Sequence, residues 1–419
     1  MDAAILFEFM AYVVEALMSI FEINSCNVGS TGGIMLSIAK AARVAGLPVK
    51  TCCAYSRTNW PKQDKYTLFI GNRISRNIHL FSGMFLGISN CLSIISTCLF
   101  LRKIKKQGCT LLHLHNLHNS YINLPLLFRF IKKNHIPVIW TLHDCWSFTG
   151  RCPHFVMTKC DRWQKGCHDC PYPKKSYPQS YIDTSRMMWK FKCNWFTGIE
   201  NCIIVTPSQW LADLVKQSYL KDYPVKVINN GIDLSVFKPI ESSFREKYGL
   251  TDKKVVLGVA FGWGKRKGFD VFVELASRLS DDYRIVLVGT DDNVEKQLPA
   301  KIISIHRTQN QKELAEIYTA ADVFANPTRE ENYPTVNMES IACGTPVVTF
   351  RTGGSPEIPD ETCGSVVDCD DIDAMEIEIR RICEEKPYSV EACLKRAKSF
   401  DMNDRFKEYV DLYKEFIQN

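Results

Sequence analysis

The sequence lacks a strong excess of charge of either sign. Its 419 residues carry 52 Lys and Arg against 46 Asp and Glu, which gives a formal net charge of +6. This mild and dispersed excess gives no support for nucleic-acid binding, although weak attraction to anionic lipid stays open. The composition is globular, with 46% hydrophobic residues, and the length suits two domains better than one core.

A secretory signal is also missing. Residues 1–17 have no basic region, and they contain Asp2, Glu8 and Glu15, which argue against a membrane span as well. A good first strand, residues 19–25, follows at once. We therefore expect residues 1–17 to be an extension or a misassigned start, and the eighteen cysteines to be reduced cytosolic thiols.

The dinucleotide fingerprint is absent too, because no Gly-x-Gly-x-x-Gly is followed by an acid about twenty residues on, which argues against an NAD enzyme. The glycine-rich stretch that is present, VGSTGGI at 28–34, leads into an expected helix, Ile34 to Ala45. Gly32 and Gly33 either let the backbone approach a ligand or form a plain tight turn.

One mostly apolar stretch, residues 84–101, is too diluted by Gly, Ser, Asn and Thr to be expected to span a membrane. Four basic residues follow it: Arg102, Lys103, Lys105 and Lys106. The stretch fits a core helix, and because of its basic end it also fits a helix that lies on the bilayer surface.

Two short apolar runs, 111–116 and 137–144, flank a helical pattern at 124–133 and indicate a parallel-sheet unit. Parallel sheets bind ligands at the carboxyl ends of their strands. We therefore expect four polar residues at the edge of a binding site: His115, Asn116, His143 and Asp144. We interpret His113 as a structural residue.

Four cysteines, Cys152, Cys160, Cys167 and Cys170, fall within nineteen residues and end in Cys-x-x-Cys. Such a group predicts a structural zinc that holds an irregular loop together. The seven residues between Cys152 and Cys160 are unusual for a zinc knuckle, so free thiols or a labile disulfide remain alternatives.

The second half of the chain repeats the strand-helix rhythm and predicts another doubly wound α/β domain. We expect domains at 18–220 and 221–402, the second containing strands at 255–261, 284–289 and 301–305. Its first turn, Gly262 to Gly268, is cationic at a helix start, where a pyrophosphate would sit unless the turn is merely solvated.

The stretch 326–357 holds the most chemistry per residue. A strand ending near Ala325 runs into a loop with Glu330 and Glu331, and a helix opens near Thr335 with Glu339 one turn inside it. Backbone N–H groups at the helix start can bind hydroxyls or phosphate oxygens. Carboxylates accept paired hydrogen bonds, so the two glutamates suit the hydroxyls of a sugar.

Glu331, Glu339 and the segments ACGTPVV (342–348) and TGGSPE (352–357) resemble the donor-binding signature of glycosyltransferase family 4. The loop ENYPTVNME is similar to that of the bacterial branch which builds capsule, O-antigen, lipopolysaccharide or colanic-acid-type exopolysaccharide. The resemblance covers about residues 18–357. It implies the GT-B fold, with two Rossmann-like doubly wound domains that face an interdomain cleft and a last helix, about 403–419, that packs back on the first domain.

This resemblance also implies an activity. A retaining hexosyltransferase would move a sugar from a UDP-, GDP- or dTDP-sugar to a lipid-linked glycan. It would be cytoplasmic, in peripheral contact with the membrane, and would use neither nucleic acid nor a catalytic metal. Two alternatives remain: a nucleotide-sugar epimerase or hydrolase on the same fold, which turns over donor alone, and a catalytically silent sugar-nucleotide-binding protein.

The resemblance assigns roles residue by residue. The catalytic residues would be Glu331, His143 and Lys267, with His143 in a Thr-x-His-Asp segment that faces the donor sugar. The donor-binding residues would be Gly32, Gly33, Arg266, Lys267, Asn332, Tyr333, Pro334, Thr335 and Glu339. Gly262 stands where the family has an arginine, five residues before Lys267, so Arg266 or Lys265 would take its part.

Overall fold

The computed structural model describes residues 19–56, 58–59, 65–172 and 180–418. The chain divides into two compact units, residues 1–228 with 406–419 and residues 229–405. The expected extension at residues 1–17 lies outside the described residues. The first unit continues past the expected boundary at residue 220, because strand β7 (Val225–Val227) completes its sheet.

The first unit is a seven-stranded parallel sheet in the order β3-β2-β1-β4-β5-β6-β7. Its other strands are β1 (Ser19–Asn24), β2 (Val49–Ala54), β3 (Thr67–Ile70), β4 (Cys109–Leu114), β5 (Val138–Thr141) and β6 (Cys202–Thr206). Its helices are α2 (Gly29–Val44), α3 (Arg73–Leu86), α4 (Ile94–Lys106), α5 (Leu124–Lys133), α6 (Ser185–Phe196) and α7 (Gln209–Lys216), with short 3-10 turns at Cys145–Phe148 and Arg162–Gln164.

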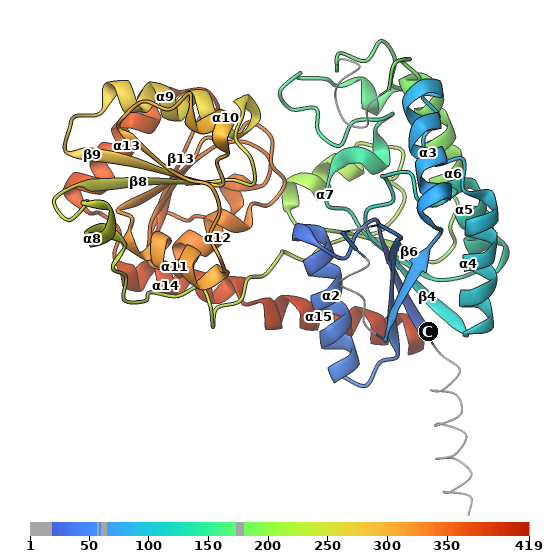
Figure 1. The fold of residues 1–419 in the computed structure, drawn as a ribbon. Coiled ribbons are helices and arrows are strands. Elements are labelled where there is room, and N and C mark those ends of the chain that lie inside the picture. The colour runs from blue at the N-terminus through green and yellow to red at the C-terminus, as the bar shows by residue number, and fades with distance from the viewer. Residues whose placement is uncertain (1–18, 57, 60–64, 173–179, 419) are drawn as a thin grey trace, which may run out of the picture. The chain divides into compact units, whose positions relative to one another are not determined.

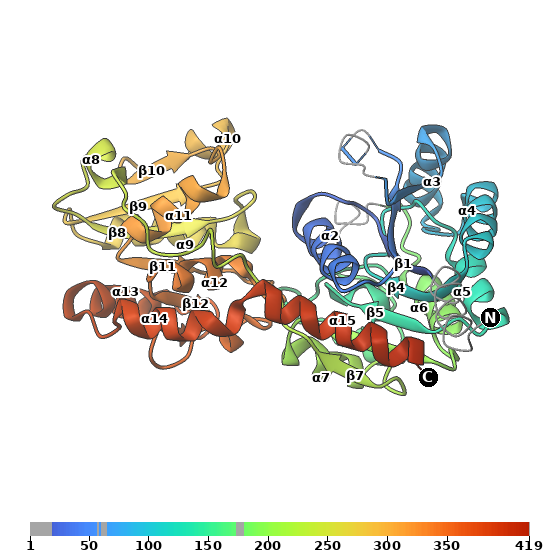
Figure 2. The same ribbon diagram turned by 90° about the horizontal axis from the view of Figure 1, so that it is seen from below.

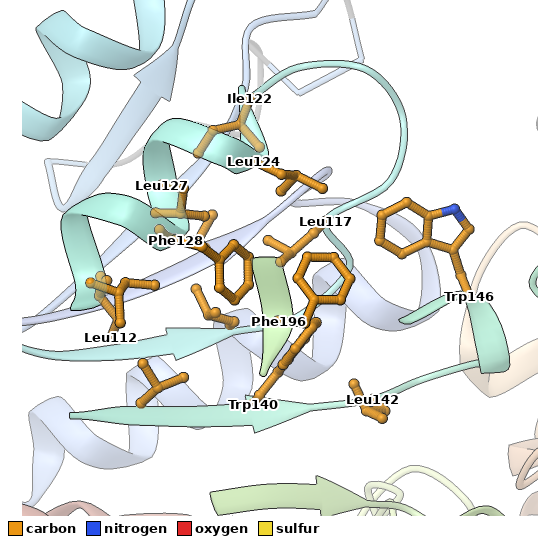
Figure 3. Packing of buried hydrophobic residues seen from close by; sticks show 14 of the residues in the cluster. Leu112, Leu117, Ile122, Leu124, Leu127, Phe128, Trp140, Leu142, Trp146 and Phe196 are labelled. Atoms are coloured by element: carbon orange, nitrogen blue, oxygen red, sulfur yellow. The ribbon is translucent and has the colours of Figure 1, made fainter. Parts of the chain in front are cut away.

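Alternation along the strands sends neighbouring side chains to opposite faces of this sheet. One face packs against α4, α5 and α6, where the rings of Phe128, Trp140 and Phe196 meet with centroids 4.7 to 5.6 Å apart (Figure 3). Phe21, Ile23, Leu112 and Leu114 point into the same core. The residues between them, including Glu22 and His113, therefore point to the opposite face.

Helix α15 (Met402–Gln418) contributes to that opposite face. Its residues from Phe406 onward belong to the first unit, and Tyr413 donates a hydrogen bond from its hydroxyl to the Glu22 carboxylate at 2.9 Å. Tyr409 stacks on the His113 ring at a centroid distance of 5.5 Å. The end of the chain thus completes the core of the unit that the first strand begins.

The second unit is a six-stranded parallel sheet in the order β10-β9-β8-β11-β12-β13. Its strands are β8 (Lys254–Val259), β9 (Tyr283–Val288), β10 (Ile302–Ile305), β11 (Val323–Asn326), β12 (Val347–Phe350) and β13 (Gly364–Val367). Its helices are α8 (Phe244–Tyr248), α9 (Phe269–Arg278), α10 (Asp292–Glu295), α11 (Gln311–Ala320), α12 (Thr335–Ala342), α13 (Ile372–Glu385) and α14 (Val390–Ala397), with short 3-10 turns at Lys265–Lys267, Ser355–Glu357 and Lys398–Phe400.

Helices cover both faces of the second sheet (Figure 1). Val255 and Leu257 of β8 point to the face covered by α11 and α12, whereas Val256 points to the face covered by α9 and α13. A strand buried on both faces reads as a continuous apolar run, as β8 does. Both units therefore have the doubly wound α/β architecture that the sequence predicted.

The apolar stretch 84–101 is not one helix. Helix α3 ends at Leu86, because Gly87 adopts a left-handed conformation with φ of 66°, and α4 begins only at Ile94. The two helices lie beside each other at one edge of the first unit (Figures 1 and 2). Among the described residues, no helix combines the length and apolar character that a membrane span needs.

Candidate functional site

Three loops of the second unit are joined by hydrogen bonds at the carboxyl ends of β8, β11 and β12. The Arg329 N–H donates to the Arg266 carbonyl at 2.9 Å, and the Thr352 hydroxyl donates to the Thr328 carbonyl at 2.7 Å. The sheet order reverses between β8 and β11, since the chain proceeds from β8 to β9 on one side and through β11 to β12 on the other. Ligands of open α/β sheets bind at such a reversal.

Arg329 is the residue that holds these loops most firmly. Its side chain is only 8% exposed, and its guanidinium makes two parallel hydrogen bonds to the Asp270 carboxylate at 2.7 and 2.9 Å. It also bonds the Asp370 carboxylate and the Lys265 carbonyl. Burial by itself would raise the pKa of Asp270, but the bonds and charge of Arg329 bring that pKa below its usual value. Arg329 was not predicted from the sequence, where its one signal is an arginine directly before two glutamates.

Lys267 and Glu331 form an ion pair between the first of these loops and the second. Their side chains are 23% and 22% exposed, so both still reach solvent. Two predicted catalytic residues are thus brought together from positions 64 apart in the sequence. A phosphate that entered here would compete with Glu331 for the Lys267 ammonium.

Glu339 has different partners. It accepts hydrogen bonds from the Tyr318 hydroxyl, at 3.1 Å, and from Thr335 one turn earlier in α12. Burial raises the pKa of the Glu339 carboxyl to about 7, and these two hydrogen bonds offset only part of that rise. The carboxyl therefore changes its charge near neutral pH.

Residues 332–335 make hydrogen bonds and packing contacts within the protein that were not predicted from the sequence. The Asn332 N–H donates to the Glu331 carboxylate at 3.2 Å, and the Asn332 carbonyl accepts from the Gly354 N–H at 2.7 Å. The Tyr333 side chain packs in the hydrophobic core. Pro334 precedes α12 without a side-chain cap, so the start of this helix remains suited to an anion.

The tight packing of these loops depends on Gly353. This residue has φ of 55°, and a Cβ built there would lie 1.7 Å from the Glu331 carbonyl oxygen. A side chain at this position would push the third loop away from the second. The Thr-Gly-Gly segment therefore has a steric reason for its glycine.

In the turn Lys265–Lys267 the carbonyls of Lys265 and Arg266 face the protein, since both accept hydrogen bonds from Arg329. The side chains of Lys265 and Arg266 are exposed. Gly268 closes the turn with φ of 74° before α9 begins. The three cationic side chains thus surround the start of a helix.

In the first unit, Gly32 and Gly33 differ. They are the fourth and fifth residues of α2, whose N-cap residue Val28 provides no side-chain cap. A Cβ at Gly32 would lie 2.6 Å from the Asn27 backbone, so packing requires a glycine at this position. Gly33 is exposed, with open space where a Cβ would lie, so packing makes no such demand there.

His143 follows β5, and its Nε2 lies 3.0 Å from Nδ1 of the buried His115. The next residue, Asp144, accepts a hydrogen bond from His118 at 3.1 Å. Burial lowers the pKa of His143 to about 3 and that of His115 to about 3 as well. Both imidazoles are therefore neutral at neutral pH.

His113, interpreted as structural from the sequence, has both ring nitrogens bonded. Its Nδ1 lies 2.5 Å from the Tyr413 hydroxyl and its Nε2 lies 2.8 Å from the Thr141 hydroxyl. The fully buried Glu22, which the sequence analysis did not single out, accepts from the same tyrosine. The missed signal was polar residues at alternate positions of neighbouring strands: Glu22, His113, His115, Thr141 and His143.

The four cysteines of the predicted zinc site, Cys152, Cys160, Cys167 and Cys170, line one small cavity together with His168. The Gly150 N–H donates to the Cys167 sulfur at 3.1 Å. Among the described residues, however, no three of these sulfur atoms lie within 4.8 Å of one another. All eighteen cysteines are described, and none forms a disulfide, which excludes the labile disulfide from this structure.

Two family models match the chain. Residues 36–236 match the model of Glycosyltransferase Family 4, and residues 253–385 match that of Glycosyl transferases group 1. WcaC of Escherichia coli K12, a glycosyl transferase assigned to colanic acid biosynthesis, is 27% identical over 63% of this chain and 65% of its own length. The D-inositol 3-phosphate glycosyltransferase of Mycolicibacterium smegmatis is 29% identical over 40% of this chain and 41% of its own. The chain thus matches less than two thirds of each relative.

Solved structures share the fold across nearly the whole chain. Sucrose-phosphate synthase from Thermosynechococcus elongatus matches with a TM-score of 0.69 and 18% identity, over 96% of this chain and 99% of that one. HepE of Anabaena, solved with UDP and glucose, matches with a TM-score of 0.67 and 13% identity, over 95% and 100%. At these identities the likeness shows the fold alone, and it confirms the predicted GT-B architecture.

The hydrogen bonds of the Arg329 side chain to Asp270, Asp370 and Lys265, called the clamp below, can be tested without a ligand. We expect Arg329→Met to release the turn 264–268, because two carboxylates and a carbonyl lose their shared donor. Hydrogen exchange of the backbone amides at 264–268 should accelerate at least tenfold. Arg351→Met is the matched control, since Arg351 is 60% exposed and pairs only with the exposed Asp368 among the ion pairs of the described residues. Unchanged exchange in the Arg329 variant would contradict the clamp.

Proposed function

Because the chain belongs to glycosyltransferase family 4, we propose that it transfers a sugar from a nucleotide diphosphate sugar to a growing bacterial surface polysaccharide. The observation that carries this proposal is the joined set of loops in which Lys267 pairs with Glu331 near the start of α12. A cation beside a helix start suits a pyrophosphate, and carboxylates suit sugar hydroxyls. The UDP, glucose and UDP-glucose in the HepE structures support a nucleotide-sugar donor.

In this proposal the second unit holds the nucleotide. Glu339 accepts hydrogen bonds from the ribose, and Lys267 with Arg266 binds the pyrophosphate, so that Glu331 leaves its ion pair and turns to the sugar. Negative charge on the pyrophosphate grows as the glycosidic bond breaks, and Lys267 offsets it. Arg329 acts at one remove, because it fixes the turn that carries Lys267.

The first unit contributes His143, which contacts the donor sugar. We propose retention of the anomeric configuration by attack on the same face that the leaving group departs from. A phosphate oxygen of the donor then accepts the proton of the acceptor hydroxyl. No side chain is assigned as a covalent nucleophile, so the two-carboxylate mechanism of glycosidases is not used here.

The acceptor in this proposal is a lipid-linked glycan. A cavity of about 530 Å³ in the first unit supports it, lined by apolar residues of α3, such as Leu80, Phe81 and Met84, and by His118 and Arg151. Apolar walls suit a lipid chain, and the polar residues suit a phosphate or sugar. His118 in the wall of this cavity bonds Asp144, the neighbour of His143 in the sequence, which supports an acceptor site near the proposed catalytic residue.

We further propose that the edge formed by α3 and α4 lies on an anionic membrane. On α3, Ile74, Ile78, Phe81 and Phe85 are spaced as one helical stripe, and each is more than half exposed. On α4, Ile95 and Leu99 are 77% and 59% exposed. The basic residues Arg73, Arg102, Lys103, Lys105 and Lys106 lie exposed on the same helices, and this combination favours anionic headgroups.

The donor assignment is tested in two steps. A thermal-shift screen against UDP-, GDP- and dTDP-sugars identifies the donor, because a ligand at one hundred times its dissociation constant stabilises by about 2.7 kcal/mol. Donor-saturation curves of variants follow. Glu339→Ala should raise the donor KM roughly tenfold to a hundredfold, since a charge-assisted hydrogen bond is worth about 1.5–3 kcal/mol. Lys267→Ala and Glu331→Ala should lower kcat itself.

The control for that series is Lys253→Ala, which changes a partly exposed lysine just before the amino end of β8. Wild type should also bind donor more tightly at pH 8 than at pH 6, because the pKa of Glu339 is raised to about 7 and only the ionised carboxylate accepts both ribose hydroxyls. Glu339→Gln should abolish this pH dependence. A Lys267→Ala variant altered in KM alone, or donor turnover without any acceptor, would refute the assignment.

Membrane contact is tested by sedimentation with vesicles. The wild-type chain should bind vesicles rich in anionic lipid more strongly than zwitterionic ones, and added salt should weaken the binding. Phe81→Glu with Phe85→Glu should abolish it, since both phenylalanines would otherwise insert into the headgroup region. Ile377→Glu, at a 63% exposed position of α13, is the matched control. Equal binding of all variants would argue against this surface.

We also propose one structural zinc bound by Cys152, Cys160, Cys167 and Cys170, supported by the shared cavity of the four thiols. Tetrahedral zinc requires sulfur atoms about 3.8 Å apart, so the thiols must move closer together than they lie here. Metal analysis of freshly purified, reduced protein should find about one zinc per chain, and Cys167→Ser should lower that content. Cys393→Ser, in α14, is the control. Absence of zinc from the wild-type protein would reject the site.

A further inference from the structure

The first unit contains a row of titratable side chains that leads from the sheet core to His143. Glu22 of β1, His115 after β4 and His143 after β5 come from neighbouring strands and point to one face of the sheet. Nε2 of His143 lies 3.0 Å from Nδ1 of His115, and Nε2 of His115 lies 3.7 Å from Oε2 of Glu22. Glu22 and His115 are fully buried, whereas His143 is partly exposed.

The inner step of this row has two unsatisfied atoms that face each other. Within the described part of the chain, neither Oε2 of Glu22 nor Nε2 of His115 has a hydrogen-bond partner. Buried polar atoms rarely stay unpaired, and a shift of roughly 0.7 Å would bring these two to hydrogen-bond distance. One proton must lie between them, either on the carboxyl or on the imidazole.

A metal ion is the alternative occupant, because Glu22, His113 and His115 could together present three ligand atoms. His113 argues against it. Both of its nitrogens are already hydrogen-bonded, to Tyr413 and Thr141, so neither offers a lone pair without breaking a buried contact. The space between Oε2 of Glu22 and Nε2 of His115 therefore suits a shared proton better than a metal ion.

We propose that Glu22, acting through His115, decides which nitrogen of the His143 ring carries the proton. With Glu22 protonated, its O–H donates to Nε2 of His115, which carries its own proton on Nδ1 and donates to Nε2 of His143. His143 then holds its proton on Nδ1. With Glu22 ionised, Nε2–H of His115 donates to the carboxylate, Nδ1 accepts from Nε2–H of His143, and Nδ1 of His143 becomes an acceptor.

The proton count of this relay balances, because each imidazole keeps one proton in both states and Glu22 alone gains or loses one. Neutral imidazoles are required, and burial supplies that condition by lowering the pKa of both histidines to about 3. Burial also raises the pKa of Glu22 to about 8, while the Tyr413 hydrogen bond and the charge of Arg43 oppose the rise. The exchange of tautomers is therefore expected near pH 8.

The other groups that face Glu22 do not replace it as the switch. Tyr409 and Tyr413 of α15 have raised pKa values through burial, and burial raises that of Cys52 on β2, so all three stay neutral. Burial lowers the pKa of His113, which is then neutral as well. Arg43 of α2 also faces Glu22, and its charge lowers the pKa of that carboxyl. At the outer end of the row, the charge of Asp144 raises the pKa of His143 and that of His118 lowers it. Within the row itself, Glu22 is the member whose pKa lies between 6 and 9.

The consequence for the reaction depends on the proposed function, in which His143 contacts the donor sugar. Below about pH 8 the Nδ1–H of His143 can donate to a sugar oxygen; above it the same nitrogen can only accept. Glu22 is a positioning residue in this sense, since it never touches the substrate. It determines whether Nδ1 of His143, two side chains away, donates or accepts a hydrogen bond.

The test is a spectrum that needs no activity. In the full-length protein labelled with ¹⁵N-histidine, long-range ¹H–¹⁵N correlation spectra should show His143 passing from Nδ1–H to Nε2–H as the pH rises from 6 to 9. In Glu22→Gln the Tyr413 hydroxyl fixes the amide oxygen, and the amide N–H₂ faces His115. This variant should therefore keep His143 as Nδ1–H throughout. His143→Gln assigns the signal.

A second variant keeps the test decisive if Glu22→Gln folds poorly. His115→Phe retains the ring stacking between His113 and His143 but has no nitrogens, so the tautomer of His143 should lose its transition near pH 8. The same tautomer behaviour in wild type and a folded variant would overturn the relay.

Failure of the proposed function is distinguishable, because wild type would then show no sugar transfer while the spectra stayed as expected. If transfer is found, its kcat should change near pH 8 in wild type and not in Glu22→Gln.

Discussion

Burial on both faces is the constraint on which both sheets depend. A parallel strand covered by helices on each side has no position for an unpaired polar side chain, so chemistry is confined to the places where strands end. The loops after β8, β11 and β12 obey this rule, and so does His143 after β5. Glu22 and His113 break it, since they lie inside the first sheet. They are tolerated because Tyr413 donates a hydrogen bond to Glu22, and because Tyr413 and Thr141 are both hydrogen-bonded to His113.

The second unit shows how a charged site is held ready without a ligand. Its cationic side chains are concentrated in one turn, where their positive charges would repel one another if no acceptor offset them. Arg329 adds a further positive charge, but its guanidinium is hydrogen-bonded to two aspartates and a backbone carbonyl. Lys267 is paired with the carboxylate of Glu331. Arg329 and Lys267 therefore each have a local acceptor, and an incoming pyrophosphate could replace that of Lys267, where the pair still reaches solvent.

Much of the fold was predictable because its signals are local. The strand-loop-helix unit around Glu331 and Thr335 was placed within a residue or two, since a short apolar run, a polar loop and a helix start follow one another directly. Arg329 was missed because its partners, Asp270 and Asp370, lie 59 and 41 residues away and only the sheet order brings them close. The break at Gly87 was missed because hydrophobicity alone does not distinguish one helix from two. Burial of the Tyr333 side chain was not predicted either, because it depends on packing between distant segments.

Helix α15 has a consequence for how this chain is made. Tyr413 bonds Glu22 across 391 residues of sequence and His113 across 300. During synthesis the strands of the first unit leave the ribosome long before this tyrosine does, and the entire second unit is made in between. Until the last helix emerges, a carboxyl and an imidazole in the middle of the first sheet lack their hydroxyl partner. The first unit to be translated is therefore the last to be finished, and a nascent chain spends most of its translation with that sheet uncapped.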